Sequence, residues 1–257
     1  MQWLDRLMQA RCRMRGYYPV TIGNSSFRGD PEHIPFWKKV SAGYWEQQTF
    51  AVLKRLLTEE SMYCDIGAWI GPTVLYAAQR CRKVYCLEPD RVAYQYLLRN
   101  IQLNGLENTL PFHLALSAEN GLRRMSSPRG KRGDSMTSLI RPDGKQAQEV
   151  LCLRWQQWLE LVGKPRFDTI KMDIEGGEFA LLPTMKEYLA ENTPNLFLSV
   201  HPHLLPEAER FEEMCRLTEI LSVYGACYDR GGKRLAQHSL LDEQAVRFAG
   251  TYLLLPE

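Results

Sequence analysis

The first residues with the types and spacing for chemistry follow an apolar, strand-like run. Asp65 closes this run, Gly67 and Gly71 frame a tight turn around Ala68, and Pro72 stands at the first position of a helix. Glycines at such a turn allow positive φ angles and let a large cofactor lie against bare backbone. A carboxylate at the strand end repels a pyrophosphate and attracts a cationic sulfonium amino acid. The turn therefore favours S-adenosylmethionine over a dinucleotide.

A second carboxylate, Glu88, stands before Pro89 at the end of the next strand, 23 residues after Asp65. An acid beside the topological switch point of an open sheet accepts hydrogen bonds from both ribose hydroxyls of a nucleoside. The glycine spacing is GxxxG and not GxGxxG, which also argues against a nicotinamide cofactor. The predicted cofactor contacts in this region are Asp65, Gly67, Ala68, Gly71, Glu88 and Pro89.

A third group of polar residues ends the predicted fourth strand. Lys171, Asp173 and Glu175 share one face if the strand stays extended, at the edge where open α/β sheets bind ligands. We predict that Asp173 is the catalytic base or acceptor anchor and also contacts the cofactor, with Lys171 and Glu175 orienting it. The alternative is a structural network of salt bridges, in which Glu178 complements the dipole of the following helix.

Two histidines, His201 and His203, follow the predicted fifth strand. Histidine titrates near neutral pH, so either ring is a candidate general base or acceptor contact. Together with Asp173 they can also form a mixed nitrogen and oxygen site for a divalent metal. A third interpretation is that both histidines have only a structural role as packed polar side chains. A divalent metal site remains an alternative that the sequence does not favour, and we predict that catalysis proceeds without a metal.

Strands and helices alternate around these residues. The strands expected from apolar runs are 62–66, 83–87, 111–116, 169–174 and 196–201, and the helices are 45–57, 72–80, 90–104, 154–162 and 177–191, the last interrupted at Pro183. This alternation predicts an α/β fold with a doubly wound, mostly parallel sheet. Runs at 223–229 and 248–254 predict an antiparallel pair at one edge. Residues 17–45 form an irregular lead-in, and residues 1–45 precede a domain at 46–257.

Several segments together resemble the FkbM family of S-adenosylmethionine-dependent methyltransferases. They are Gly43–Glu46, Asp65–Gly71, Leu87–Pro89, Asn100 with Leu103 and Asn104, Ala115–Ser117, Ser138 with Leu139, and Ile170–Glu178. The resemblance implies a Rossmann-like seven-stranded methyltransferase fold and methylation of a hydroxyl on a sugar or polyketide-like product. It also implies that Glu46 helps to hold the methionine end of the cofactor. The adenine is expected near Ala115 and Ser117. Where many members carry a carboxylate after the fifth strand, this chain reads Ser199–His203.

The segment 123–144 is long, polar and rich in Gly, Ser and Arg. A loop of this length inside a compact domain is usually a functional lid or a disordered segment. Its basic residues are Arg123, Arg124, Arg129, Lys131, Arg132 and Arg141. As a lid it can recognise an anionic acceptor, such as a phosphorylated or nucleotide-linked sugar, through charge-assisted hydrogen bonds.

The whole chain has the composition of one ordinary globular domain. It has 257 residues and a formal net charge of +2, which gives no basic footprint for nucleic acid. Its seven cysteines form no CxxC pair, and this usage suits reduced thiols in the cytoplasm. No apolar stretch approaches the roughly 20 residues of a transmembrane helix. A helix at residues 3–15, with Trp3, Leu4, Leu7 and Met8 on one side and Arg6 elsewhere, either docks on the domain or associates weakly with a membrane surface.

These observations rank three functions. The leading one is an O-methyltransferase that uses S-adenosylmethionine and acts on a hydroxyl of a small molecule, sugar or glycan. The second is N-methylation of a nucleobase or protein, which lacks an Asn/Asp-Pro-Pro-Tyr tetrapeptide after the fourth strand. The third is a non-catalytic scaffold protein that binds the cofactor, and the acids Asp65, Glu88, Asp173 and Glu175 argue against it.

Overall fold

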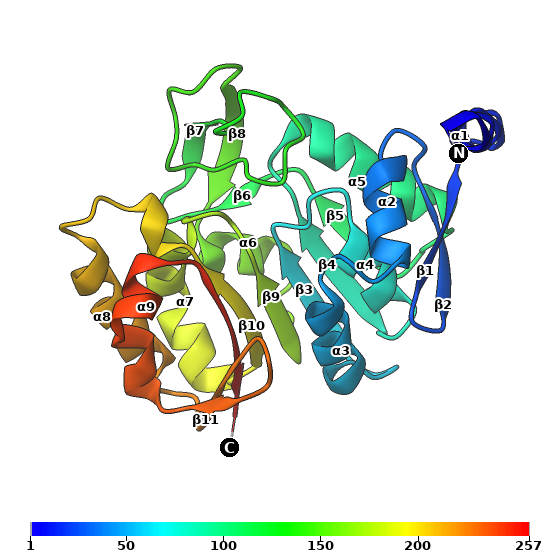
Figure 1. Ribbon diagram of the computed structural model, residues 1–257. Helices are drawn as coiled ribbons and strands as arrows, with labels where there is room; N and C mark the ends of the chain where they lie inside the picture. The colour runs from blue at the N-terminus through cyan, green and yellow to red at the C-terminus, as the bar shows by residue number, and fades with distance from the viewer. Residues whose placement is uncertain (1, 257) are drawn as a thin grey trace.

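The computed structural model describes the backbone of residues 2–256, and the side chains of these residues except 2–6 and 237. Within this part of the chain, eight strands form the central sheet in the order β12-β11-β13-β10-β9-β3-β4-β5 (Figure 1). The strands are β3 (Met62–Ile66), β4 (Lys83–Leu87), β5 (Thr109–Phe112), β9 (Thr169–Met172), β10 (Asn195–Val200), β11 (Ala226–Asp229), β12 (Arg234–Leu235) and β13 (Gly250–Leu255).

The middle of the sheet is parallel and one edge is antiparallel. Strands β10, β9, β3, β4 and β5 run in the same direction, while β13 pairs antiparallel with β10 and with β11. The chain order reverses between β3 and β9, which makes a switch point at their carboxyl ends. The α/β prediction and the antiparallel C-terminal pair are therefore confirmed. The predicted seven strands become eight because the two-residue β12 extends the edge.

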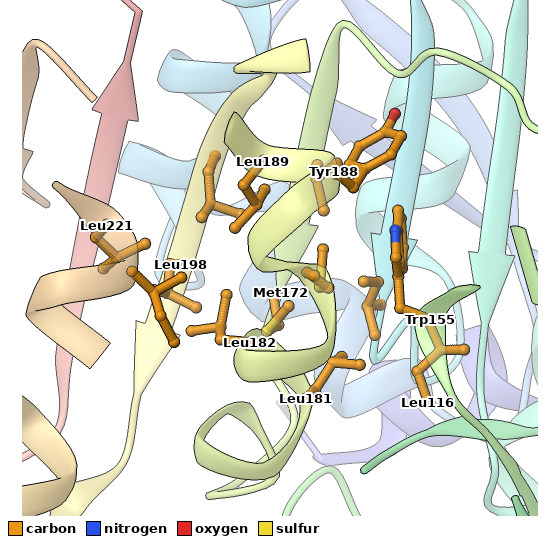
Figure 2. Close-up of a cluster of buried hydrophobic side chains, with 14 of the residues drawn as sticks. Leu116, Trp155, Met172, Leu181, Leu182, Tyr188, Leu189, Leu198 and Leu221 are labelled. Carbon is orange, nitrogen blue, oxygen red and sulfur yellow. The ribbon is translucent and has the colours of Figure 1, made fainter. Parts of the chain in front are cut away.

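Helices cover both faces of the sheet, because alternate strand residues point to opposite sides. Tyr85 and Leu87 pack in the cluster formed with α6 (Trp155–Leu161), α7 (Glu178–Asn192) and α8 (Arg210–Leu221). Their neighbours Val84 and Cys86 pack in the opposite cluster, formed with α2 (Ile34–Ser41), α3 (Gln47–Leu56), α4 (Pro72–Ala78) and α5 (Arg91–Leu103). Figure 2 shows side chains of α7 meeting Met172 of β9 and Leu198 of β10. This sandwich holds the carboxyl ends of the strands in fixed positions.

Helix α7 is continuous, so the predicted interruption at Pro183 is wrong. Proline lacks an N–H and removes one hydrogen bond from the helix. Leu181, Leu182 and Met185 around it are fully buried. The burial of these side chains offsets the lost bond, and the helix runs on to Asn192.

The lead-in is also more regular than predicted. Residues 17–45 contain an antiparallel hairpin of β1 (Tyr18–Ile22) and β2 (Ser25–Gly29), followed by α2. The hairpin forms because Gly23 supplies a positive φ at the turn, while Val20, Ile22 and Phe27 alternate into the core. Before it, α1 (Gln2–Arg15) confirms the N-terminal helix, but the side chains of Trp3, Leu4 and Arg6 lie outside the described residues.

A second sheet interrupts the predicted strand 111–116. The chain leaves the central sheet after Phe112, and β6 (Ala115–Leu116) pairs with β8 (Gln148–Leu153), which pairs in turn with β7 (Gly121–Met125). Residues 126–147, here called the lid, connect β7 to β8 and lie at the top of Figure 1. The first three residues of the predicted loop 123–144 therefore belong to a strand. α8 and the short α9 (Glu243–Arg247) had no counterpart in the prediction.

Two further findings concern the chain as a whole. All seven cysteines lie in the described part and none forms a disulfide. Among the helices of residues 2–256, none combines the length and the apolar character needed to cross a lipid bilayer.

Candidate active site

The glycine turn after β3 has the backbone conformation expected from the sequence. Gly67 and Gly71 have φ angles of +87° and +92°, a region that L side chains disfavour. A Cβ on Gly67 would overlap the carbonyl oxygen of Asp173, and one on Gly71 would lie 2.6 Å from Leu97. The turn is held from below, because Asn100 donates a 2.8 Å hydrogen bond to the carbonyl of Ile70. Both glycines are therefore required.

Asp65 points into the protein and not toward the cofactor loop's open side. Its carboxylate is fully buried, accepts hydrogen bonds from Thr73 and Tyr63, and pairs with Nζ of Lys171 at 3.2 Å. Burial lowers the pKa of Lys171, but the negative charges of Asp65 and Asp173 outweigh it and raise that pKa overall. The structure therefore places Lys171 as the counter-ion of Asp65 and not as an orienting partner of Asp173. Asp65 supports the loop from inside.

A pocket opens at the carboxyl ends of β3, β4 and β9, between the sheet and the lid. The predicted residues that line it are Gly67, Glu88, Pro89, Ala115, Asp173 and Glu175. Five predicted cofactor residues do not line it: Glu46, Asp65, Ala68, Gly71 and Ser117. Apolar walls come from Leu87, Leu114, Leu116, Met125, Leu139 and Ile174. The pocket thus joins the glycine turn, the predicted ribose acid and the predicted adenine region.

Glu88 has the geometry expected of a ribose-binding acid. Its two carboxylate oxygens accept backbone hydrogen bonds from Trp69, at 2.8 Å, and Asp90, at 2.7 Å. Each oxygen retains a lone pair for a ligand hydroxyl. Burial raises the pKa of Glu88 to about 8, although the two backbone donors act in the opposite direction. With a pKa of about 8, Glu88 loses its proton near neutral pH at a small cost in free energy. It can therefore accept hydrogen bonds from a ligand as a carboxylate.

The ionisable side chains that line the pocket are all acidic. They are Glu88, Asp134, Asp173 and Glu175, of which Glu88 is largely protonated near pH 7 in the ligand-free protein because its pKa is about 8, and no lysine or arginine is among the lining residues. Such a pocket attracts cations and repels phosphate groups. The pocket therefore favours a cationic ligand, as was predicted from Asp65, although other acids supply the charge.

The lid is tied to the rim of the pocket by hydrogen bonds. Nε1 of Trp69 donates to the carbonyl of Gly133 at 3.0 Å, and the N–H of Gly133 donates to Asp90 at 2.9 Å. Further along, Ser138 donates to the carbonyl of Glu175 at 2.6 Å. Neither Trp69 nor Asp90 was predicted to belong to the site. An Asp directly before an apolar-periodic helix is an N-cap signal that could have identified Asp90.

Beside the pocket, His201 stands among three carboxylates. Glu178 is fully buried at the start of α7 and accepts hydrogen bonds from the backbone N–H and Nδ1 of His201, the latter at 3.1 Å. Nε2 lies 3.7 Å from Asp173 and 3.8 Å from Glu175. Burial alone would lower the pKa of His201, but the bond to Glu178 and the three negative charges raise it to about 9. With this pKa the ring carries a proton at neutral pH in the ligand-free protein.

Glu175 and His203 are placed differently from their predictions. β9 ends at Met172, so Glu175 does not continue the face of Lys171 and Asp173. It turns with a φ of +50°, and burial together with neighbouring Asp173 and Glu178 raises its pKa despite the nearby His201. His203 lies in a short 3₁₀ turn, 6.0 Å from the ring of His201 and outside the carboxylate cluster.

Glu46 and Ser117 have other partners. Glu46 begins α3, where it pairs with Arg230 at 2.6 Å and accepts a hydrogen bond from Thr49. The N–H of Ser117 donates to Leu153 and continues the pairing of β6 with β8. Neither side chain is among those lining the pocket.

Comparison with known proteins identifies the class. The model of the FkbM methyltransferase domain matches residues 65–225, more than half of the chain. The chain therefore belongs to the FkbM methyltransferase family, as the resemblance implied.

Individual relatives are distant. An uncharacterized protein of Methanocaldococcus jannaschii is 34% identical over 56 residues, 22% of each chain. A tRNA (guanine(37)-N(1))-methyltransferase of Vitis vinifera is 31% identical over 70 residues, 26% of this chain and 12% of that protein. The chain thus aligns with less than a quarter of either relative's length. An FkbM methyltransferase structure from Methylobacillus flagellatus aligns with a TM-score of 0.47 and 17% identity, over 77% of this chain and 44% of that one.

Proposed function

We propose that the protein transfers the methyl group of S-adenosylmethionine to a hydroxyl of a small molecule, sugar or glycan. The observation that supports this cofactor is the pocket lined by four acidic side chains and by no lysine or arginine. A sulfonium with an ammonium group suits this charge. Glu88 would accept the ribose hydroxyls, Gly67 would leave room for the cofactor, and the apolar wall near Ala115 would hold the adenine.

Asp173 is the residue at the reacting end of this pocket. Its side chain is 40% exposed, whereas Asp65 is fully enclosed. Methyl transfer is an in-line displacement, so the protein has to align the acceptor oxygen with the methyl carbon and help the hydroxyl to lose its proton. We propose that Asp173 contacts the acceptor hydroxyl. The hydroxyl would pass its proton through the Asp173 carboxylate to solvent water, its oxygen would attack the methyl carbon, and the electron pair of the sulfur–carbon bond would return to sulfur.

The acceptor is proposed to be anionic, because basic and aromatic side chains gather next to the pocket. Lys39, Arg129 and Lys131 line a neighbouring cleft together with Phe36, Trp45 and Trp69. Aromatic faces pack against sugar or base rings, and the cations suit a phosphate. Arg129 also pairs with Asp134 at 3.2 Å. Arg132 does not line this cleft and donates to the carbonyl of Gln146 instead.

A transfer assay tests this function. The protein is incubated with methyl-labelled S-adenosylmethionine and pools of sugars, sugar phosphates, nucleotides and natural products, and the product is identified by mass and methylation position. We expect label on a hydroxyl. Asp173→Asn should lower kcat at least tenfold and leave cofactor affinity, measured by calorimetry, within a few-fold. Cofactor binding without label in any acceptor pool would instead support the scaffold alternative.

The basic cleft is tested once an acceptor has been identified. The double variant Arg129→Gln/Lys131→Gln should raise KM for the acceptor about tenfold or more, because two charge-assisted contacts are lost. Arg132→Gln, in the same lid but outside the cleft, is the matched control. An unchanged KM in the double variant would contradict an anionic acceptor bound here.

N-methylation remains the second candidate. The grapevine relative is named as a tRNA guanine methyltransferase, and a ring nitrogen of a base needs no acid to remove a hydroxyl proton. The same assay with a tRNA pool separates the two, since label in RNA at a nitrogen would contradict the hydroxyl acceptor.

A further inference from the structure

Three side chains beside the pocket have the types and positions of metal ligands. Nε2 of His201, a carboxylate oxygen of Asp173 and a carboxylate oxygen of Glu175 all lie within 4.8 Å of one another. They come from three places in the chain: the end of β10, the end of β9, and the turn before α7. The sequence grouped Asp173 with both histidines, but the structure brings in Glu175 and leaves out His203.

The distances suit one ion. Nε2 lies 3.7 Å from Asp173 Oδ1 and 3.8 Å from Glu175 Oε2. Two metal–ligand bonds of about 2.1 Å can reach donor atoms up to about 4.2 Å apart. The two carboxylates need to approach each other by only a few tenths of an ångström. Both are partly exposed to the pocket, so coordination positions stay open on that side.

Glu178 prepares the imidazole as a ligand. Its buried carboxylate accepts the hydrogen bond of Nδ1, which leaves Nε2 as the nitrogen directed at Asp173 and Glu175. A carboxylate behind a metal-binding histidine fixes the tautomer and the ring orientation in this way. Glu178 also accepts the backbone N–H of His201. The ring is therefore held in place before any ion arrives.

The net negative charge of the cluster also favours the binding of a cation. Three carboxylates surround a single imidazole, which carries at most one positive charge, and the nearby Lys171 is paired with Asp65. The excess negative charge lies at the end of the pocket where Asp173 is exposed. A divalent ion that replaces the imidazole proton would balance this excess.

We propose that Asp173, Glu175 and His201 bind one divalent cation of the Mn²⁺ type, which accepts mixed nitrogen and oxygen ligands. The role of this ion rests on the proposed function. The acceptor hydroxyl binds at an open position and releases its proton to solvent water, because the ion lowers the pKa of bound hydroxyl groups. The oxygen then attacks the methyl carbon as the carbon–sulfur bond breaks toward sulfur. With the ion bound, Asp173 would act on the acceptor through the ion instead of by direct contact.

Direct binding of Mn²⁺ tests the site without cofactor or acceptor. The full chain is stripped with EDTA, desalted and titrated with Mn²⁺, while the free ion is followed by electron paramagnetic resonance and the heat by calorimetry. We expect one ion per chain. Asp173→Asn and His201→Gln should each weaken binding at least tenfold, and Glu178→Gln about 10- to 100-fold.

Glu60→Gln is the control for these variants, because Glu60 is exposed and belongs neither to the pocket lining nor to the cluster. It should keep the Mn²⁺ affinity within about twofold. Circular dichroism and thermal unfolding show whether each variant folds. The absence of saturable Mn²⁺ binding to the unmodified chain, or equal affinity in His201→Gln, would overturn the site. Stoichiometric binding with full methyl transfer after EDTA treatment would overturn only its catalytic role.

Discussion

At the scale of single residues, the site depends on close backbone approaches as much as on charge. Gly67 lies against the carbonyl of Asp173, so the glycine turn and the end of the pocket at Asp173 are in contact. Glu88 joins the turn to the next strand through the N–H of Trp69. A substitution of Gly67 or Glu88 is therefore expected to affect the neighbouring strand ends as well as its own position.

Gly67→Ala should destabilise the protein and abolish cofactor binding. A left-handed alanine costs about 1–2 kcal/mol, and its Cβ would in addition overlap the carbonyl of Asp173. Gly163→Ala is the matched control, since Gly163 has a similar φ of +83° and no atom within 4 Å of the added Cβ. Urea unfolding and calorimetry with the cofactor measure both effects. Equal losses in the two variants would argue against the close contact.

The raised pKa of Glu88 predicts that the stability of the ligand-free protein depends on pH. Its pKa is about 8 in the folded state and near the ordinary value of 4.5 in the unfolded chain. Between these values the folded state binds the extra proton, so the free energy of unfolding falls as pH rises from about 4.5 to 8 and then levels off. Chemical unfolding across this range measures the slope. Glu88→Gln should reduce it, and Glu60→Gln, at an exposed carboxyl, should not.

At the scale of elements, the lid decides access to the pocket. With residues 126–147 in this position the cavity measures about 60 Å³, whereas pockets for ligands of drug size hold roughly 300 Å³ or more. This cavity alone is too small for such a ligand, and we expect the lid to move when a cofactor enters. Its polar attachment consists of one hydrogen bond from Trp69, two to Asp90 (from Gly133 and Thr137) and one to Glu175, and each is modest in net free energy.

Asp90→Ala should loosen the lid. Asp90 caps α5 and also accepts hydrogen bonds from Gly133 and Gln148. Loss of the cap costs about 1 kcal/mol, and trypsin should cleave after Arg129 and Lys131 several times faster. Asp168→Ala is the control, because Asp168 accepts the N–H of Met62 far from the lid. Equal cleavage rates in both variants would mean that Asp90 acts only on global stability.

At the scale of the whole molecule, the N-terminal hairpin and the methyltransferase sheet form one unit. Asn100 of α5 donates to Ile70 in the cofactor turn and to Asp30 after β2, and accepts the N–H of Asp30. Asn104 makes a second link, to the backbone of Arg28. The lead-in is therefore part of the support of the cofactor site.

Asn100→Ala should weaken cofactor binding although Asn100 does not line the pocket. The variant leaves the buried carbonyl of Ile70 and the N–H of Asp30 without these partners, which costs about 1–3 kcal/mol for each group. Thermal unfolding and calorimetry with the cofactor measure the effects. Asn104→Ala, at the more exposed link, should lose less stability and retain cofactor affinity. Unchanged cofactor affinity in Asn100→Ala would show that the lead-in does not support cofactor binding.

The sequence by itself determined the sheet, the glycine turn and the order of the acids. Apolar runs with period two and glycines at fixed spacing are local signals, and they placed β3 and β4 at their observed bounds. The lead-in hairpin and the continuous α7 were missed because burial against distant elements stabilises them.

Only the tertiary structure decided which acid faces the pocket. Asp65 and Glu88 both end a strand, but Lys171 from β9 draws Asp65 inward, while the turn at Trp69 leaves Glu88 at the pocket wall. In the same way Glu178 selects His201 over His203, because it reaches only the first of them. Side-chain direction at a strand end depends on partners that are far away in the sequence, and spacing alone cannot specify it.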